Sequence, residues 1–175
     1  MSTEPSKRER VVSLFIDAPI ERVWDEITKT GSVQRALYNT TMIGDLSPGS
    51  RIRFTSADHK RVFVVGEVIE VTPPTRFVHT YIMTMEQDPE TEIAWDLTPE
   101  GSGCRVTLTH SGWTDEHTTE DKTVKAWGEI LSLLKSEIET GSLPLKTRIT
   151  YAMMGLFSFA LPKRTTAEHA DEQGW

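Results

Sequence analysis

The spacing of hydrophobic residues at the start of the chain predicts one strand followed by two short helices. Residues 11–16 form a mostly apolar run that stops at Asp17, which is typical of a strand. Residues 20–27 then repeat apolar side chains three or four positions apart, which is typical of a helix with one buried face. The segment 31–41 predicts a second short helix, with Leu37 and Tyr38 at its apolar end.

From Met42 to His110 the period of the pattern becomes two, which indicates consecutive β-strands. Apolar residues alternate with polar ones in short runs, and glycine and proline residues separate the runs. Gly66 interrupts the longest run, where a glycine often marks a bulge or a bend. Strands joined by short turns pair antiparallel, so this region predicts a sheet whose last strand is 104–113.

The period changes again after Trp113 and predicts one long helix of about 25 residues. Acidic residues lie at its start, where they suit the positive end of the helix dipole, and Gly141 is a plausible stop. Its apolar stripe consists of Val124, Trp127, Ile130, Leu131, Leu134 and Ile138. The whole order predicts an α+β domain in which a curved antiparallel sheet of about six or seven strands wraps around this helix. The space between such a sheet and its helix is where small molecules bind.

Composition and charge narrow the possible functions. The 175 residues are 37% hydrophobic and 26% charged, with a formal net charge of −7, which argues against a nucleic-acid partner. The lone Cys104 excludes an intrachain disulfide and a cysteine-cluster metal site. Because the N-terminus lacks a signal-peptide core and no apolar run could span a bilayer, we expect a cytoplasmic protein.

Five segments of the chain resemble a known family. In order, they are "FIDAPIERVWDEIT", "GDLSPGSRIRF", "GEVIEVTPPTRFVHTYIM", "WDLTPEGSGCRVTLTHSGW" and "AWGEILSLLKSEIETG". Their order and spacing resemble the SRPBCC superfamily, which has the START-like or helix-grip fold. They are most similar to the branch of homologues of the activator of heat-shock protein 90 ATPase. The resemblance covers residues 9–141 and makes 1–8 a disordered N-terminus.

The resemblance implies a hydrophobic cavity between the sheet and the long helix. We therefore expect the protein to bind a hydrophobic or amphipathic small molecule, such as a lipid-, polyketide- or flavonoid-like compound, without a cofactor. Two alternatives remain open. One is a co-chaperone-like module that binds a protein, and the other is an enzyme similar to cyclases or hydrolases that uses His110.

The candidate ligand-binding residues lie on the apolar faces of the predicted strands and of the long helix. They are Phe54, Tyr81, Trp95, Val106, Leu108, His110, Trp127, Leu131 and Leu134. His79 shares a strand face with Tyr81, and if this face is the inner one, His79 is a further polar group that orients a ligand.

His110 ends the apolar row of the last strand and is the low-ranking catalytic candidate. A catalytic base needs an orienting acid and a water or nucleophile within hydrogen-bond reach. Asp96 lies on the strand face opposite Trp95 and is poorly placed for this. We therefore expect His110 to be structural or to contact the ligand.

Metal and enzyme motifs are absent from the sequence. The five histidines are scattered without metal-ligand spacing, so no metal site is predicted. Neither a GxSxG elbow nor a glycine-rich phosphate loop is present, which makes an enzyme the less favoured interpretation.

The segment after Gly141 extends beyond the resemblance. Residues 142–164 form an apolar and basic extension that we expect to be partly helical. Its residues 145–161 are predicted to dock on the domain or to self-associate or bind another protein, and peripheral membrane contact is a less favoured alternative. Residues 165–175 are expected to be disordered.

Overall fold

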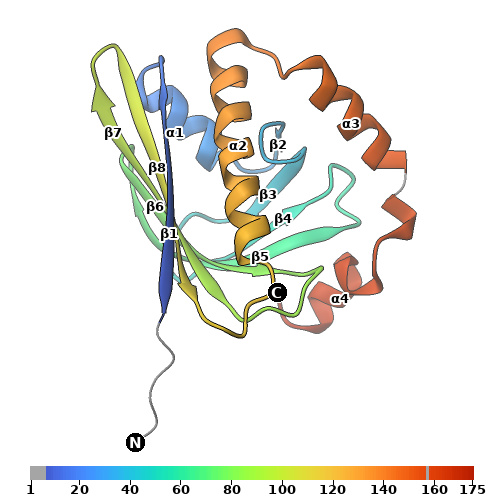
Figure 1. Ribbon diagram of the computed structural model, residues 1–175. Coiled ribbons are helices and arrows are strands. Elements are labelled where there is room, and N and C mark those ends of the chain that lie inside the picture. The colour runs from blue at the N-terminus through green and yellow to red at the C-terminus, as the bar shows by residue number, and fades with distance from the viewer. Residues whose placement is uncertain (1–6, 157) are drawn as a thin grey trace, which may run out of the picture.

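The computed structural model describes residues 7–156 and 158–175, so most of the predicted disordered segment 1–8 lies outside the described residues. Figure 1 shows an antiparallel sheet that curls around a long helix, α2. Its elements are β1 (Arg8–Ile16), α1 (Ile20–Thr28), β2 (Val33–Gln34), β3 (Thr40–Gly44), β4 (Arg51–Thr55), β5 (Val62–Thr72), β6 (Arg76–Met83), β7 (Thr91–Glu100), β8 (Gly103–Trp113), α2 (Glu120–Thr140), α3 (Leu145–Leu156), η1 (Ser158–Ala160), η2 (Lys163–Thr165) and α4 (Ala167–Glu172).

The eight strands form one sheet in the order β1-β8-β7-β6-β5-β4-β3-β2. The chain enters at one edge, α1 carries it to the other edge, and the following strands return as a meander until β8 pairs with β1. The α+β class and the helix-grip architecture predicted from the sequence are thus confirmed. The sheet has one or two more strands than expected, because a two-residue strand, β2, replaces the predicted second helix.

The prediction of a helix at 31–41 is wrong, because these residues form a short strand and a turn that pack against the neighbouring elements. Gln34 is fully buried, and its side-chain nitrogen donates to the carbonyl oxygens of Glu26 and Ile27 at the end of α1, at 3.0 and 2.9 Å. Tyr38 and Asn39 have φ angles of 55° and 57°, a left-handed conformation that a right-handed helix does not accommodate. These contacts turn the chain sharply into β3.

The curvature of the sheet depends on Gly66, as its position in the longest strand predicted. A Cβ atom at this position would lie 2.0 Å from the carbonyl oxygen of Thr80 on β6, so only glycine permits this approach of the two strands. A bulge between Val68 and Glu70 lies just beyond it. A bulge of this kind bends the strand that carries it.

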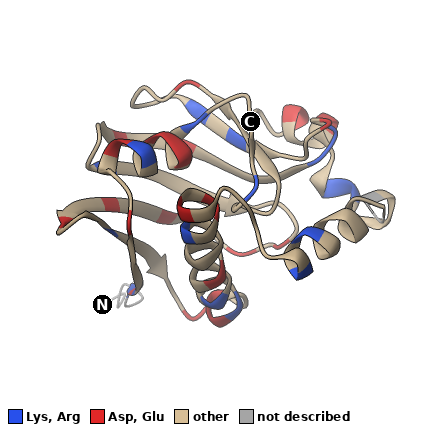
Figure 2. Cartoon of the chain, turned by 90° about the horizontal axis from the view of Figure 1, so that it is seen from above, with Lys and Arg blue, Asp and Glu red and all other residues tan. Residues whose placement is uncertain are grey.

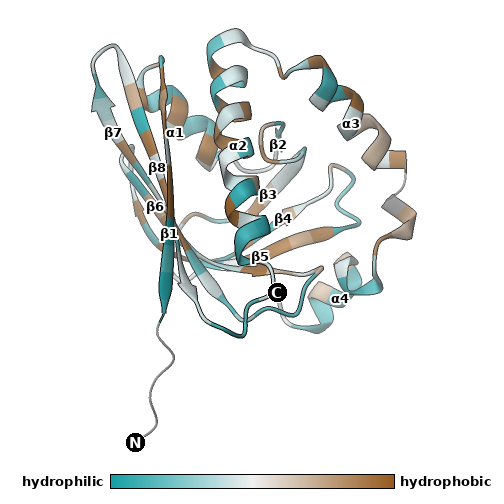
Figure 3. Cartoon of the chain, in the orientation of Figure 1, coloured by the Kyte–Doolittle hydropathy of each residue, from teal (hydrophilic) through white to brown (hydrophobic). Residues whose placement is uncertain are grey.

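Helix α2 buries its apolar stripe against the inner face of the sheet. Trp127, Ile130, Leu131, Leu134 and Ile138 are all buried. The helix ends where Gly141 adopts a φ of 74° and donates its N–H to the carbonyl oxygen of Glu137, which is the stop that the sequence predicted. Figure 3 shows how hydrophobic and hydrophilic positions are distributed along the strands and along this helix.

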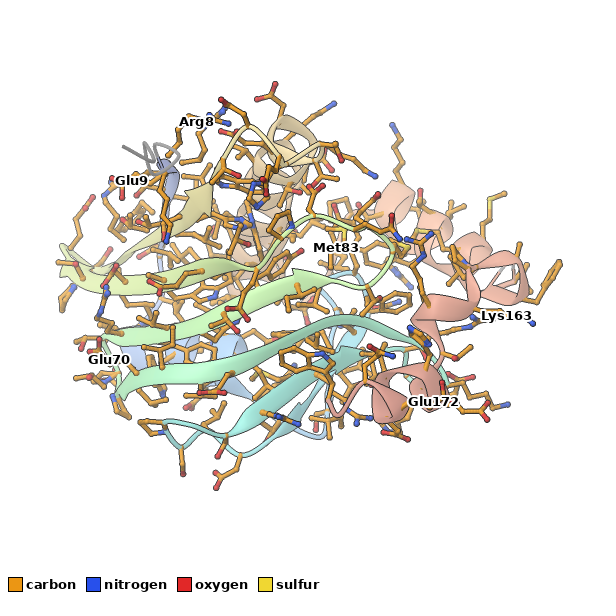
Figure 4. The ribbon with its side chains drawn as sticks, turned by 90° about the horizontal axis from the view of Figure 1, so that it is seen from below. Arg8, Glu9, Glu70, Met83, Lys163 and Glu172 are labelled. Carbon is orange, nitrogen blue, oxygen red and sulfur yellow. The ribbon has the colours of Figure 1, made fainter. Side chains whose placement is uncertain are left out.

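The end of the chain is folded, which corrects the expected disorder of residues 165–175. Thr165 is fully buried, and Thr166 caps α4 by accepting a hydrogen bond from the backbone N–H of His169. Ala170 packs on Val62 and Val65 of β5. Figure 4 shows Lys163 and Glu172 on this C-terminal segment, on the side of the molecule away from Arg8 and Glu9.

Arg61 joins this segment to the domain. Its Nη1 donates to the carbonyl oxygens of Leu161 and Pro162 and to the hydroxyl of Thr165, at 3.4, 3.3 and 3.1 Å. Replacing Arg61 with methionine removes these bonds and keeps the aliphatic stem. We expect faster hydrogen exchange at the backbone N–H of Ala170, with local opening easier by about 1 kcal/mol.

The matched control is Lys60→Met at the neighbouring position, because the Lys60 side chain is exposed and only its carbonyl oxygen bonds α4. Exchange at Ala170 should be unchanged in this control. Equal acceleration in the two variants would contradict the role given to the Arg61 side chain.

Candidate functional site

An apolar cavity of about 80 Å³ lies between the inner face of the sheet and α2. The residues that line it come from the turn before β3, from strands β3 to β7, and from one face of α2. They are Leu37, Thr40, Phe54, Phe63, Val64, His79, Tyr81, Trp95, Trp127 and Ile130. Phe63, Val64 and Tyr81 are only partly buried, whereas the other lining residues are buried.

Four of the nine predicted ligand-binding residues line this cavity: Phe54, Tyr81, Trp95 and Trp127. Trp95 and Trp127 meet edge to face, with ring centroids 5.8 Å apart, so sheet and helix contact each other through these two rings. The other five do not line it. Val106, Leu108, Leu131 and Leu134 belong to the closed core, and His110 lies behind Trp127.

Two polar side chains, His79 and Tyr81, face the cavity from β6. Nδ1 of His79 lies 2.7 Å from the carbonyl oxygen of Thr80, which can only accept, so Nδ1 carries the proton. Nε2 is therefore an acceptor, and neither Nε2 nor the Tyr81 hydroxyl has a hydrogen-bond partner within the described part of the chain. Burial lowers the pKa of His79 to about 4 and raises the pKa of Tyr81. At neutral pH the cavity therefore offers one acceptor and one hydroxyl.

His110 is completely buried and has a hydrogen bond at each ring nitrogen. The indole nitrogen of Trp127 donates to Nδ1 at 3.0 Å, and this fixes the proton on Nε2 because an indole N–H can only donate. Nε2 in turn donates to the hydroxyl of Thr91 at 2.7 Å, and that hydroxyl donates to the carbonyl oxygen of Tyr81 at 3.1 Å. No ring nitrogen of His110 is left for a substrate.

The charge state of His110 follows from the same surroundings. Burial lowers its pKa to about 3, and the nearby His79 and His117 add to this effect. A second proton would sit on Nδ1, opposite the N–H of Trp127, where two donors would face each other. His110 is therefore neutral and holds the Trp127 ring that forms one wall of the cavity.

A larger hollow of about 440 Å³ lies beside the start of β1 and is mainly polar. Among the side chains that line it, Arg8 already pairs with Asp115 and Glu120, and Thr91 already bonds His110 and Tyr81. The carboxylates of Glu9, Glu90 and Glu92 at this hollow would disfavour an anionic ligand. The smaller apolar cavity, with its unpaired polar groups, is the better candidate site.

The sequence pattern missed five residues of the cavity wall: Leu37, Thr40, Phe63, Val64 and Ile130. Phe63 and Val64 are adjacent and would point to opposite faces of a regular strand. The pairing of β4 with β5 shifts between Phe54 and Thr55, which leaves Phe63 as an extra residue in a bulge. Within the described residues, no group of His, Cys, Asp and Glu side chains is arranged to hold a metal ion.

Comparison with known proteins gives one family and many similar structures. The model of the family "activator of Hsp90 ATPase homolog 1-like protein" matches residues 17–139. CalU16 from Micromonospora echinospora is 20% identical, covers 92% of this chain and 98% of its own, and has a TM-score of 0.59. No curated protein matches the sequence.

Two other similar structures carry Hsp90-related names. The Aha1 dimer from Colwellia psychrerythraea is 20% identical, with 77% of this chain and 98% of that chain covered and a TM-score of 0.60. An HSP90 activator from Plasmodium falciparum is 16% identical, with 78% and 97% covered and a TM-score of 0.60. At such identities these likenesses show the fold, and the helix-grip architecture is common to all of them.

Proposed function

The chain belongs to the family of activator of Hsp90 ATPase homolog 1-like proteins, and from this premise we propose that it binds the apolar part of a small amphipathic molecule in the cavity between the sheet and α2. The observation that supports this most directly is the cavity itself. Its wall is apolar and aromatic, and the two unpaired polar groups of His79 and Tyr81 face it.

The size of the cavity limits what can enter it. A volume of about 80 Å³ is well below the 300–1,000 Å³ typical of pockets that enclose whole ligands. We therefore infer that a lipid- or polyketide-like ligand places one alkyl end or one ring inside. The remainder would lie at the mouth, against the partly buried Phe63, Val64 and Tyr81. Removing apolar ligand surface from water supplies the driving force.

We assign His110 a positioning role. It would hold the Trp127 indole in the plane that forms the cavity wall. The cyclase- or hydrolase-like alternative needs a free base nitrogen, and the two hydrogen bonds of His110 leave it none.

A co-chaperone role is the second candidate, and the Hsp90-related names of similar structures favour it. The two candidates predict different responses in the NMR spectrum. An apolar ligand should shift the signals of Tyr81, Trp95 and Trp127. Added Hsp90 should instead broaden signals of exposed residues and leave the cavity signals in place.

The series of straight-chain alcohols from butanol to dodecanol tests the ligand hypothesis. We expect affinity to rise about fourfold for each added methylene while the chain fills the cavity. The gain should stop once further carbons lie outside. The measurement is a titration followed by the indole N–H signals of Trp95 and Trp127. The proposal would be contradicted if affinity kept rising with each methylene up to dodecanol, or if the signals of these indoles did not shift.

Tyr81→Phe tests the polar contact in the same titration. Loss of one hydrogen bond should weaken hexanol binding about three- to tenfold and leave benzene binding nearly unchanged. Tyr38→Phe is the matched control, because Tyr38 does not line the cavity. If Tyr81→Phe weakens hexanol and benzene equally, the ring packs against the ligand and the hydroxyl has no role.

A further inference from the structure

Helix α3 presents an apolar face to the solvent. Figure 1 shows α3 lying apart from α2, along the outside of the molecule. Its exposed residues include Leu145, Ile149, Met153 and Leu156, with exposed fractions between 53% and 73%. Because these positions are spaced by three or four residues, they lie on one face of the helix. A surface helix normally turns such a face inward.

The opposite face of α3 holds it against the domain. Tyr151 is buried, and its ring lies 6.0 Å from the ring of Tyr38. Leu143, just before the helix, is also buried, and Arg61 anchors the chain beyond the helix through its hydrogen bond to Thr165. Because the chain is anchored to the domain both before and after α3, the helix is held in place and its apolar face points toward the solvent.

Basic residues border this face, and acidic ones are absent. Residues 141–164 contain Lys146, Arg148, Lys163 and Arg164 and no acid, so this segment carries +4 and the rest of the chain −11. Figure 2 shows blue and no red along α3. None of the four cations forms an ion pair with another described residue. On the helix, Lys146 and Arg148 lie on either side of the apolar face.

We propose that this face of α3 binds the surface of a bilayer that contains anionic lipids. The apolar side chains would enter the boundary between headgroups and acyl chains, and the four cations would pair with lipid phosphates. A second copy of this face is a poorer partner, because it would bring two sets of four cations together. The 12-residue helix is about 18 Å long and lies in the membrane plane, since the hydrocarbon core is about 30 Å thick. No helix in the described ranges has the length and apolarity of a membrane span.

Vesicle flotation of the full chain tests this proposal. We expect binding to vesicles of phosphatidylcholine with one quarter phosphatidylglycerol, weak binding to phosphatidylcholine alone, and loss of binding as salt is raised. Lys146→Gln with Arg148→Gln should reduce partitioning about 25-fold, because each cation near an anionic surface contributes about fivefold. The proposal is independent of the ligand cavity, so failure of one leaves the other standing.

The apolar contribution needs its own pair of variants. Ile149→Glu with Met153→Glu should reduce partitioning by at least about tenfold. Val11→Glu with Ile69→Glu is the matched control, because it adds the same charge at exposed apolar positions of the sheet. The control should bind vesicles within about twofold of the wild type, and thermal unfolding should verify that each variant folds.

Three outcomes would overturn the proposal. The first is no flotation with anionic vesicles. The second is equal loss in the α3 variant and in its control, which would indicate a general charge effect. The third is a dimer in sedimentation experiments that the α3 variant abolishes, which would make this face a contact between two copies of the chain.

Discussion

Lowering the pH from 6.5 to 5 is expected to reduce the free energy of unfolding by about 3 kcal/mol. Two buried histidines cause this loss. Burial lowers the pKa of His79 from 6.5 to about 4 and that of His110 from 6.5 to about 3. Between these values and 6.5 the unfolded chain binds protons that the folded protein does not, so stability falls as the pH falls.

The expected mean slope over this window is about 1 kcal/mol per pH unit for each histidine, measured by urea unfolding at several pH values. Carboxylates with lowered pKa, such as Glu120 beside Arg8, lose their contribution only at lower pH. The window from 6.5 to 5 therefore isolates the histidines. The variant His110→Gln should lose about half of the slope, and a slope unchanged from the wild type would contradict the assignment.

The arrangement of the fold was predictable because most of it follows from periodicity. Alternation over residues 42–110 predicts an antiparallel meander, and the stripe from Trp127 to Ile138 predicts one long helix against it. Gly141 and Gly66 could be interpreted because each is required by a particular backbone geometry, a left-handed cap and a close approach of two strands.

The segment 31–41 and the end of the chain were not predictable from the same pattern. The apolar pair Leu37 and Tyr38 looks like a helix face, but the burial of Gln34 under α1 favours a strand and a turn. The segment after residue 165 is polar in composition. Its order comes from contacts with Arg61 and with the distant β5, which local composition does not report.

In the candidate site, the sequence predicted only those residues whose strand or helix face follows from the spacing of apolar positions. Trp95 and Trp127 were expected on the apolar faces of a strand and of the long helix, and the centroids of their rings lie 5.8 Å apart. The sequence did not predict Phe63, because the bulge places both Phe63 and the adjacent Val64 at the cavity. The hydrogen-bond partners of His110 were not predicted either. Thr91 lies on the adjacent strand and Trp127 on the helix, and sequence spacing does not encode how far either lies from His110.

Replacing Trp127 with alanine is expected to lower the free energy of unfolding by about 3–5 kcal/mol, the largest effect expected at any single position of the site. Three contributions add. The indole fills the space between α2 and Trp95, its removal joins new empty volume to the cavity, and Nδ1 of the buried His110 loses its donor. Urea unfolding monitored by circular dichroism measures the change, with the slope m checked for two-state behaviour.

Trp127→Phe separates the hydrogen bond from the packing. A phenyl ring keeps most of the contact with Trp95 and removes only the N–H, so we expect a loss of about 1–3 kcal/mol from the unpaired nitrogen of His110. Thermal or urea unfolding that shows the same loss for phenylalanine and alanine would mean that the ring itself contributes little.

A double-mutant cycle measures how much the hydrogen bond between Trp127 and His110 contributes to the free energy of unfolding. His110→Leu alone removes the acceptor and leaves the indole N–H buried beside an apolar side chain. In the double variant Trp127→Phe with His110→Leu, donor and acceptor are gone together, and neither is left unpaired. The two single losses should therefore exceed the loss of the double variant by about 1–2 kcal/mol. Simple additivity would show that His110 does not hold Trp127, and the cavity wall would then depend on shape alone.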